Sequence, residues 1–396
     1  MESIKSTENK KCSFCGNNKR KLKGKDDLYI CEVCVDVAQI SFNIDIDGNP
    51  KTQQTQQTQQ KQQNSYNIKN PKEYKKVLDE YVIGQEEPKK IIATALYNHI
   101  KRIQNPQLDL DKSNTLLIGK TGTGKTHLLE TASKILDIPL VVVDTTSLTS
   151  SGYIGEDVNS VIERLYKASN GDISKTEKGI IFLDEIDKNR ASLGGTNDKD
   201  VSGKAVQQEL LKILEGTIVK IYTDGNSHNK QAGEPIEINT KDILFIAGGA
   251  FVGLKEKNTV SIKPFGGSKK DKESSIIQDF GLHQYLLDYG MIPEFLGRFT
   301  SIVEFEDLSL EMMKKIITEP KNSVINKVKN LFKTSNVNIE FSDALIEGIA
   351  KKAMELDTGA RALKSILDNR LKDIMFNIDE YKDKTLLVDV DKESVI

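Results

Sequence analysis

The chain has 396 residues, 37% of them hydrophobic, a length typical of about two to three domains with a sizeable core. Its 56 Lys and Arg residues nearly balance 58 Asp and Glu residues, so the formal charge of -2 gives no overall attraction to nucleic acid or to a membrane surface. No apolar run approaches the roughly 18 residues that span a bilayer, and segment 1–11 lacks the apolar stretch of a secretory signal. Together these features predict a soluble cytoplasmic protein.

All four cysteines lie near the N-terminus in two C-x-x-C pairs, Cys12 with Cys15 and Cys31 with Cys34. Four thiolates at this spacing can close a tetrahedral Zn²⁺ site, and the metal helps to fold a module too small to bury much core. Two disulfides are disfavoured in a reducing compartment, and a thioredoxin-like redox pair needs a βαβ setting that is absent from this stretch. We therefore predict a zinc-binding domain over residues 1–48.

Residues 49–67 are rich in Gln and Thr and contain no apolar side chain before Tyr66. Such a stretch cannot offset the entropy of ordering itself, so we expect a flexible linker. A prion-like aggregating segment is the alternative that the composition allows. The shortness of the stretch favours the linker.

From Pro71 the pattern changes to helices and buried strands, with a helix expected over about 87–103. The apolar residues Val82 and Ile83 precede this helix and are candidates to cradle an adenine ring. Packing in the ordinary hydrophobic core is the alternative for both side chains.

A phosphate loop follows the apolar run 115–118 and precedes the helix-prone stretch 127–136. Its sequence motif is G-x-x-x-x-G-K-[ST], in which glycines let backbone N–H groups surround phosphate oxygens at a helix N-terminus. Lys125 is expected to reach the β- and γ-phosphates, and the Thr126 hydroxyl to bind Mg²⁺. The predicted nucleotide-binding residues are Gly119, Lys120, Thr121, Gly122, Thr123, Gly124, Lys125 and Thr126.

Two later stretches carry candidate functional side chains. Tyr153 and Ile154 lie between two glycines, a pattern that suits a mobile loop tip, although a tyrosine packed in the core is equally consistent. The apolar run 179–183 delivers Asp184 and Glu185 at its end, which is the Walker B pattern. Asp184 is expected to hold Mg²⁺, and Glu185 to act as general base on the attacking water.

The remaining chain predicts the rest of an ATPase domain over 68–306 and a small α+β lid over 307–396. Strands are expected at 139–144, 242–247, 337–341 and 385–390, and a helix at 204–215. Arg298 follows a tight turn, where a guanidinium can clamp a γ-phosphate; a surface ion pair is the alternative.

Together these motifs resemble the ClpX family, the AAA+ unfoldases of the Clp protease system within the Clp/HSP100 group, over most of residues 11–394. The resemblance implies an α/β AAA+ module, in which a parallel-sheet P-loop NTPase domain carries a small α+β lid behind a treble-clef or ribbon-like zinc domain. The segments that carry it are 11–16 with 31–35, 81–85, 119–126, 152–157, 180–185, 201–208, 290–298 and 358–361.

The resemblance also implies roles for individual residues. Tyr153 and Ile154 would form a pore loop that pushes on an unfolding polypeptide, and 199–203, with Asp200 and Val201, a second pore loop. Arg298 would be the arginine finger that reaches a neighbouring subunit's ATP, and Arg361 the lid sensor of the γ-phosphate. The implied assembly is a hexamer that uses ATP, Mg²⁺ and Zn²⁺, with the ClpP peptidase and adaptor proteins as partners.

Three loops depart from the family pattern. Where relatives that feed ClpP carry Ile-Gly-Phe, this chain has Ile262-Lys263-Pro264-Phe265, which changes spacing and stiffness and leaves ClpP docking open. The pore-entrance loop, basic in many relatives, reads Asn-Ser-His-Asn over 226–229. Lys120 stands where relatives commonly have a proline.

Three classes of function follow from these patterns. The first is a protein unfoldase, either partnered with a peptidase or acting alone on protein complexes. The second is a nucleic-acid-directed AAA+ ATPase, which the balanced charge and the aromatic pore tip disfavour, because a channel that tracks a strand is expected to be basic. The third is a zinc adaptor that does not hydrolyse its nucleotide, which the presence of Glu185 and Arg298 disfavours.

Overall fold

In a computed structural model the described residues are 11–13, 15, 22–25, 28–31, 34–35, 70–149, 156–190, 198–222, 235–253, 273–356, 358–390 and 393–395. The chain divides into two compact units, 1–64 and 65–396. The division falls within the predicted linker, which itself lies outside the described residues. Among the described residues no helix is long and apolar enough to cross a bilayer.

The first unit contains a short hairpin of β1 (Leu22–Lys25) and β2 (Leu28–Cys31), paired antiparallel with Leu22 opposite Cys31. The Ser13 amide donates to the Tyr29 carbonyl at 2.7 Å, which ties the first cysteine pair to β2. The hairpin therefore brings Cys31 beside Cys12, whose sulfur accepts the Cys31 amide at 3.3 Å.

The second unit is built around a five-stranded parallel sheet in the order β11-β3-β10-β7-β4. Because the strands are parallel, the phosphate loop after β3 and the carboxylates after β7 emerge at the same edge, with β10 between them. The strands are β3 (Thr115–Ile118), β4 (Leu140–Asp144), β7 (Ile180–Asp184), β10 (Leu244–Gly249) and β11 (Ser301–Glu304).

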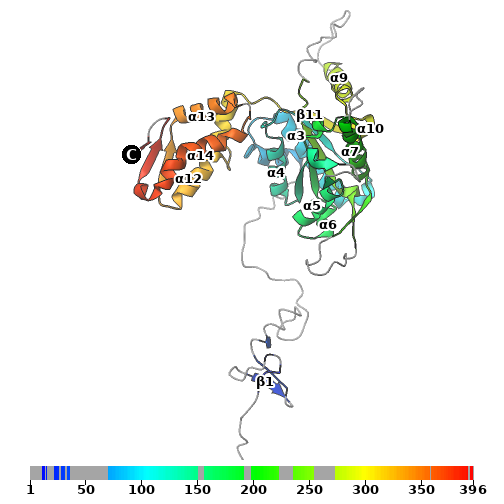
Figure 1. The fold of residues 1–396 in the computed structure, drawn as a ribbon, viewed down its shortest axis with the longest axis horizontal. Helices are drawn as coiled ribbons and strands as arrows, with labels where there is room; N and C mark the ends of the chain where they lie inside the picture. The colour runs from blue at the N-terminus through cyan, green and yellow to red at the C-terminus, as the bar shows by residue number, and fades with distance from the viewer. Residues whose placement is uncertain are drawn as a thin grey trace, which may run out of the picture. The chain divides into compact units, whose positions relative to one another are not determined.

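Helices cover both faces of this sheet (Figure 1). On one face α2 (Pro71–Asp79), α3 (Glu86–Gln104) and α4 (Lys125–Leu136) pack on a core that includes Phe182 and Ile246. On the other face α5 (Ser160–Ala168), α7 (Asp198–Glu215), α9 (Glu273–Tyr289) and α10 (Pro293–Leu296) contribute to a second core. Shorter elements are η1 (Pro106–Leu108), η2 (Thr145–Ser147), β5 (Leu148–Thr149), β6 (Glu156–Asp157), α6 (Ile173–Thr176), η3 (Ile186–Lys188), β8 (Ile218–Ile221), β9 (Ile236–Asn239) and η4 (Thr240–Asp242).

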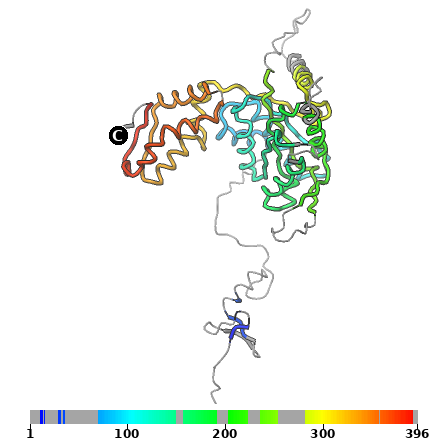
Figure 2. Tube along the Cα trace, in the orientation of Figure 1, coloured from blue at the N-terminus to red at the C-terminus, as the bar shows by residue number. Residues whose placement is uncertain are grey.

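The C-terminal segment, orange to red in Figure 2, packs helices against a three-stranded sheet around a core of its own. Ser309, Ser323 and Ser342 accept backbone N–H groups as N-caps of the first three helices, which fixes where these helices begin. The elements are α11 (Leu310–Thr318), α12 (Val324–Lys333), β12 (Asn338–Phe341), α13 (Asp343–Glu355), α14 (Arg361–Phe376), η5 (Ile378–Tyr381), β13 (Thr385–Val388) and β14 (Glu393–Val395).

Most predicted elements are confirmed, and three need correction. The strand expected over 139–144 is an edge strand, so Val142 stays 36% exposed instead of buried. The strand expected over 242–247 runs on through Gly249. The helix expected from residue 204 begins at Asp198, so Asp200 and Val201 lie in its first turns and not in a loop. Gly203 is required inside this helix, because a Cβ there would lie only 2.7 Å from the Arg190 carbonyl oxygen.

Candidate functional site

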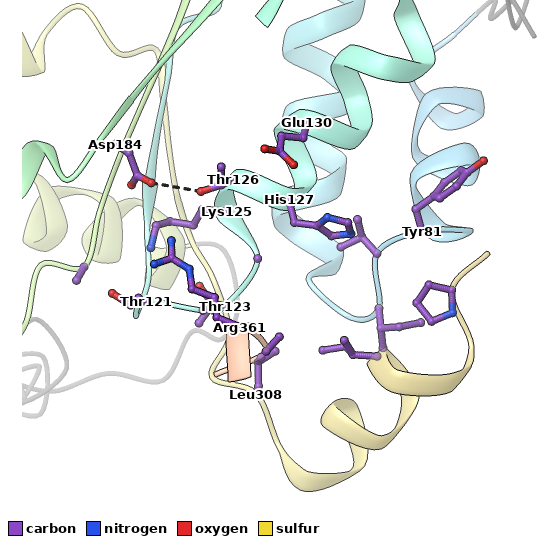
Figure 3. A pocket seen from close by; sticks show the side chains of 18 of the residues that line it. Tyr81, Thr121, Thr123, Lys125, Thr126, His127, Glu130, Asp184, Leu308 and Arg361 are labelled. Carbon is purple, nitrogen blue, oxygen red and sulfur yellow. Dashed lines mark hydrogen bonds between the residues drawn. The ribbon is translucent and has the colours of Figure 1, made fainter. Parts of the chain in front are cut away.

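A cavity of about 440 Å³ lies between the phosphate loop, the ends of β7 and β10, and the C-terminal segment (Figure 3). Its wall includes six of the eight phosphate-loop residues, 121–126, together with Asp184, Glu185 and Arg361. Apolar side chains line the opposite end. One end of the cavity thus offers N–H groups and charges, and the other offers an apolar surface for a flat ring.

The phosphate loop owes its shape to left-handed glycines. Gly122 has φ of 81° and Gly124, the N-cap of α4, has φ of 101°, values that side chains rarely adopt. Lys125 is buried beneath the loop, and its Nζ donates to the carbonyls of Gly119 at 2.5 Å and Lys120 at 3.2 Å. The carbonyls of Gly119 and Lys120 therefore hold the Lys125 ammonium. Neither Gly119 nor Lys120 lines the cavity.

Burial lowers the pKa of Lys125, and the nearby Asp184 carboxylate opposes that shift. A phosphate that entered the loop would favour the charged ammonium for the same reason, because an opposite charge stabilises the charged form.

Thr126 and Asp184 are brought together as the sequence predicts for a Mg²⁺ site. The Thr126 hydroxyl donates to Asp184 Oδ2 at 3.2 Å, the dashed contact in Figure 3. Asp184 Oδ1 accepts the Glu185 amide at 3.0 Å, and Glu185 has a left-handed φ of 58°. A hydroxyl and a carboxylate oxygen are the ligands that Mg²⁺ takes beside substrate phosphates, so these residues fit the ion.

Sequence reasoning missed Asp187, which also lines the cavity and is only 2% exposed. Its Oδ2 accepts the Phe251 amide at 3.4 Å and lies 3.3 Å from Lys188 Nζ, whereas Oδ1 has no hydrogen-bond partner among the described residues. A Cβ at Gly249 would lie 2.7 Å from that oxygen, so the glycine makes room for it. Asp187 follows Asp184 by three residues, and this closeness to the predicted Mg²⁺ ligand was the one signal in the sequence that could have marked it as a site residue.

The apolar end of the cavity joins the two parts of the second unit. Val82 and Ile83, the predicted adenine contacts, line the cavity together with apolar residues of the C-terminal segment that the sequence did not single out, namely Leu308, Ile316, Pro320 and Val324. His127 also lines this end, and burial lowers its pKa, so its ring is more readily neutral than a free histidine. A neutral, flat, hydrogen-bonding side chain beside apolar walls suits contact with a nucleobase.

The C-terminal segment touches the phosphate loop directly. The Ala360 amide donates to the Gly122 carbonyl at 3.2 Å, and Gly359 lies so close that a Cβ on it would be 2.9 Å from the same carbonyl oxygen. Arg361, the first residue of α14, points into the cavity in Figure 3. The predicted sensor arginine is thus held at the phosphate end by a contact between two backbones.

Comparison with known proteins identifies the family. Residues 110–302 match the AAA domain family (Cdc48 subfamily), and residues 308–378 match the C-terminal D2-small domain family of ClpB protein. The ATP-dependent Clp protease ATP-binding subunit ClpX 2 of Wolinella succinogenes is 39% identical over 387 residues, which cover 96% of this chain and 94% of that relative. The chain belongs to the ClpX family. The predicted fold class and the assignment as an AAA ATPase are therefore confirmed.

The ClpX resemblance also gave roles to Arg298 and to two pore loops. Arg298 follows α10, is 48% exposed, and pairs with Glu215 at the end of α7. It does not line the cavity of its own chain. The first predicted pore loop, with Tyr153 and Ile154, lies outside the described residues, as do 226–229 and the stretch 262–265.

The four cysteines of this ClpX-family chain form one cluster whose sulfur atoms all lie within 4.8 Å of one another. Cys15 Sγ and Cys31 Sγ are 3.7 Å apart, close to the roughly 3.8 Å edge of a tetrahedron with 2.3 Å zinc–sulfur bonds. A hydrogen bond with Cys15 is the main cause, and burial the second, that raise the pKa of the Cys34 thiol to about 12. A cation coordinated by thiolates would reverse that shift, so the donor set fits Zn²⁺.

Proposed function

We propose that this chain is an ATP-dependent protein unfoldase that draws polypeptides through the pore of a hexameric ring. The observation that best supports the proposal is the single cavity that gathers Lys125, Thr126, Asp184, Glu185 and Arg361. Membership of the ClpX family supports the choice of a protein as the substrate. A cytoplasmic location is part of the same proposal.

In the proposed hydrolysis, the Lys125 ammonium exchanges its hydrogen bonds with the loop carbonyls for contacts with the β- and γ-phosphates. Thr126 and Asp184 would hold Mg²⁺, and the ion would supply positive charge to neutralise the phosphates. Glu185 accepts a proton from water as the water oxygen bonds to the γ-phosphorus and the bond to the bridging oxygen breaks, giving ADP and phosphate. Arg361 contacts the γ-phosphate from the C-terminal segment.

In the proposed ring, Arg298 exchanges its partner Glu215 for the ATP of a neighbouring subunit. Its exposure and its absence from the cavity wall of its own chain are consistent with action between subunits. Differential contacts of ATP and ADP shift the angle between large domain and lid, with their boundary proposed at 306/307. That motion displaces Tyr153 and Ile154, and with them Asp200 and Val201, along the pore.

We further propose that Cys12, Cys15, Cys31 and Cys34 bind one Zn²⁺ and that the zinc domain contacts adaptor proteins. Mercurial modification of the native chain should release one zinc per chain to a chromogenic chelator. Release of no zinc from protein purified with zinc present would contradict the assignment.

Residues 262–265 depart from the tripeptide with which relatives dock on ClpP, so the test of this proposal includes ClpP as a variable. The test mixes the chain with ATP and a tagged, folded fluorescent protein, with and without ClpP, and follows fluorescence and peptide products. Unfolding with degradation supports a peptidase partner, and unfolding alone supports a remodeller that acts by itself. No loss of fluorescence in either reaction would contradict the unfoldase.

A further inference from the structure

Gln85 connects two segments that are far apart in the sequence. It is 1% exposed, and its Nε2 donates to the Glu306 carbonyl at 2.9 Å and to the Thr123 carbonyl at 3.4 Å. Its Oε1 accepts the Glu306 amide at 2.9 Å. One buried side chain therefore binds both backbone groups of Glu306 and, at the same time, the phosphate loop.

The backbone around Gln85 is unusual. Gly84 and Gln85 both have left-handed φ values, 63° and 56°, and a glutamine rarely adopts this conformation. The lid helix α11 packs on the same turn, since a Cβ at Gly84 would lie 2.3 Å from Met312 Cε. Backbone held in a rarely populated conformation persists where its surroundings determine it, often at functional sites.

Glu306 lies at the junction of the two parts of the unit. The Phe305 amide donates to the Ile118 carbonyl at 2.7 Å, so the chain is still fixed to the end of β3 one residue earlier. The two family matches end at residue 302 and begin at residue 308, on either side of Glu306. A second link, the 3.4 Å pair of Lys120 with Asp307, is exposed on both sides and contributes little.

We propose that Gln85 is the positioning residue through which nucleotide in the phosphate loop orients the lid. The proposal rests on nucleotide binding as set out above. Its bond to Thr123 is the longest of the three, so a small shift of the loop around phosphate changes that bond first. The two shorter bonds then carry the change to Glu306, from which the lid continues. A coupling element of this kind must contact both sites, and Gln85 does.

The test is hydrogen exchange on the full chain with and without ADP, followed in peptides that cover residues 119–126 and 302–310. Gln85→Met keeps the side-chain volume but removes all three bonds, and Gln85→Glu keeps only the acceptor for the Glu306 amide. Gln207→Met is the matched control. Gln207 is equally buried, and its amide bonds Asn189, Gly290 and Ile292, none of which lies in the phosphate loop or the junction.

In the native chain we expect ADP to slow exchange at both peptides, by about tenfold at the junction, within the range of ordinary coupling. Gln85→Met should keep the response of the phosphate loop and lose that of the junction, and Gln207→Met should keep both. If Gln85→Met does not fold, Gln85→Glu decides, with a junction response reduced at least threefold, a rough estimate on the same scale.

A native junction response in both Gln85 variants would overturn the proposal and leave nucleotide binding intact. The same holds if ADP protects only the phosphate loop in the native chain. Protection of neither peptide in the native chain would instead contradict nucleotide binding itself, and this coupling with it.

Discussion

Replacement of Gly122 by alanine tests whether the contact between phosphate loop and lid closes the active site. The Ala360 amide donates to the Gly122 carbonyl at 3.2 Å. A Cβ at Gly122 would lie 2.2 Å from the Thr358 carbonyl oxygen and 2.9 Å from Gly359 Cα. All of these neighbours belong to backbone, which cannot rotate away as a side chain can.

The Gly122→Ala substitution raises the free energy of the closed arrangement in two ways. An alanine at φ of 81° is strained by on the order of 1–3 kcal/mol whether or not the lid is closed. The clash acts on the closed arrangement alone, because the two backbones must separate towards the roughly 3.5 Å of ordinary contact. That separation breaks the Ala360 hydrogen bond, worth about 1 kcal/mol. The closed arrangement should therefore become at least roughly fivefold rarer relative to the open one.

Gly124→Ala is the matched control, because its φ of 101° imposes similar strain while nothing lies within 4 Å of the added Cβ. Exchange of the Ala360 amide without nucleotide should rise at least roughly fivefold in Gly122→Ala and stay native in Gly124→Ala. Steady-state hydrolysis at saturating ATP should fall by a similar factor in Gly122→Ala. Native exchange at Ala360 together with native turnover in Gly122→Ala would refute the reasoning.

Three further predictions concern other parts of the chain. Gly348→Ala, at an exposed position inside α13 with free space for a Cβ, should raise stability by about 1 kcal/mol in thermal unfolding; a lower melting temperature would contradict it. Burial lowers the pKa of His99 to about 4, against roughly 6.5 in the unfolded chain, so the unfolded state binds the extra proton between these values. Urea unfolding should show stability falling by up to about 3 kcal/mol as pH drops from 6.5 to 4, and His99→Gln should flatten that slope. Tyr153→Ala should hydrolyse ATP normally but fail to unfold a tagged fluorescent protein, and surviving unfolding would remove Tyr153 from the pore.

Much of the large sheet could be predicted, because its inner strands are apolar runs that end at recognisable motifs. The strands 115–118 and 180–184 have the predicted positions, since the phosphate loop and the paired carboxylates mark where they end. The exposure of Val142 could not be predicted in the same way. Strand order depends on pairing between distant segments, and the same run of valines is compatible with an edge strand and with a central strand of the sheet.

The sequence singled out most residues at the phosphate end of the site but missed Asp187, and at the apolar end it singled out only Val82 and Ile83. Ile316 and Pro320 line the cavity because the C-terminal segment folds back over the loop, and no local pattern announces that contact. Gln85 was recognised as part of a motif, but its three hydrogen bonds reach residues 38 and 221 positions away. Such long-range bonds come from tertiary packing and have no local signature.

The central claim is that Glu185 and its neighbours hydrolyse ATP in this cavity, and comparison of the native chain with Glu185→Gln tests it most directly. ATP binding and steady-state hydrolysis are measured on both proteins under identical conditions. We expect Glu185→Gln to bind ATP with near-native affinity and to lose turnover by at least about a hundredfold, as general-base catalysis requires. Native turnover in that variant, with ATP bound, would contradict the mechanism.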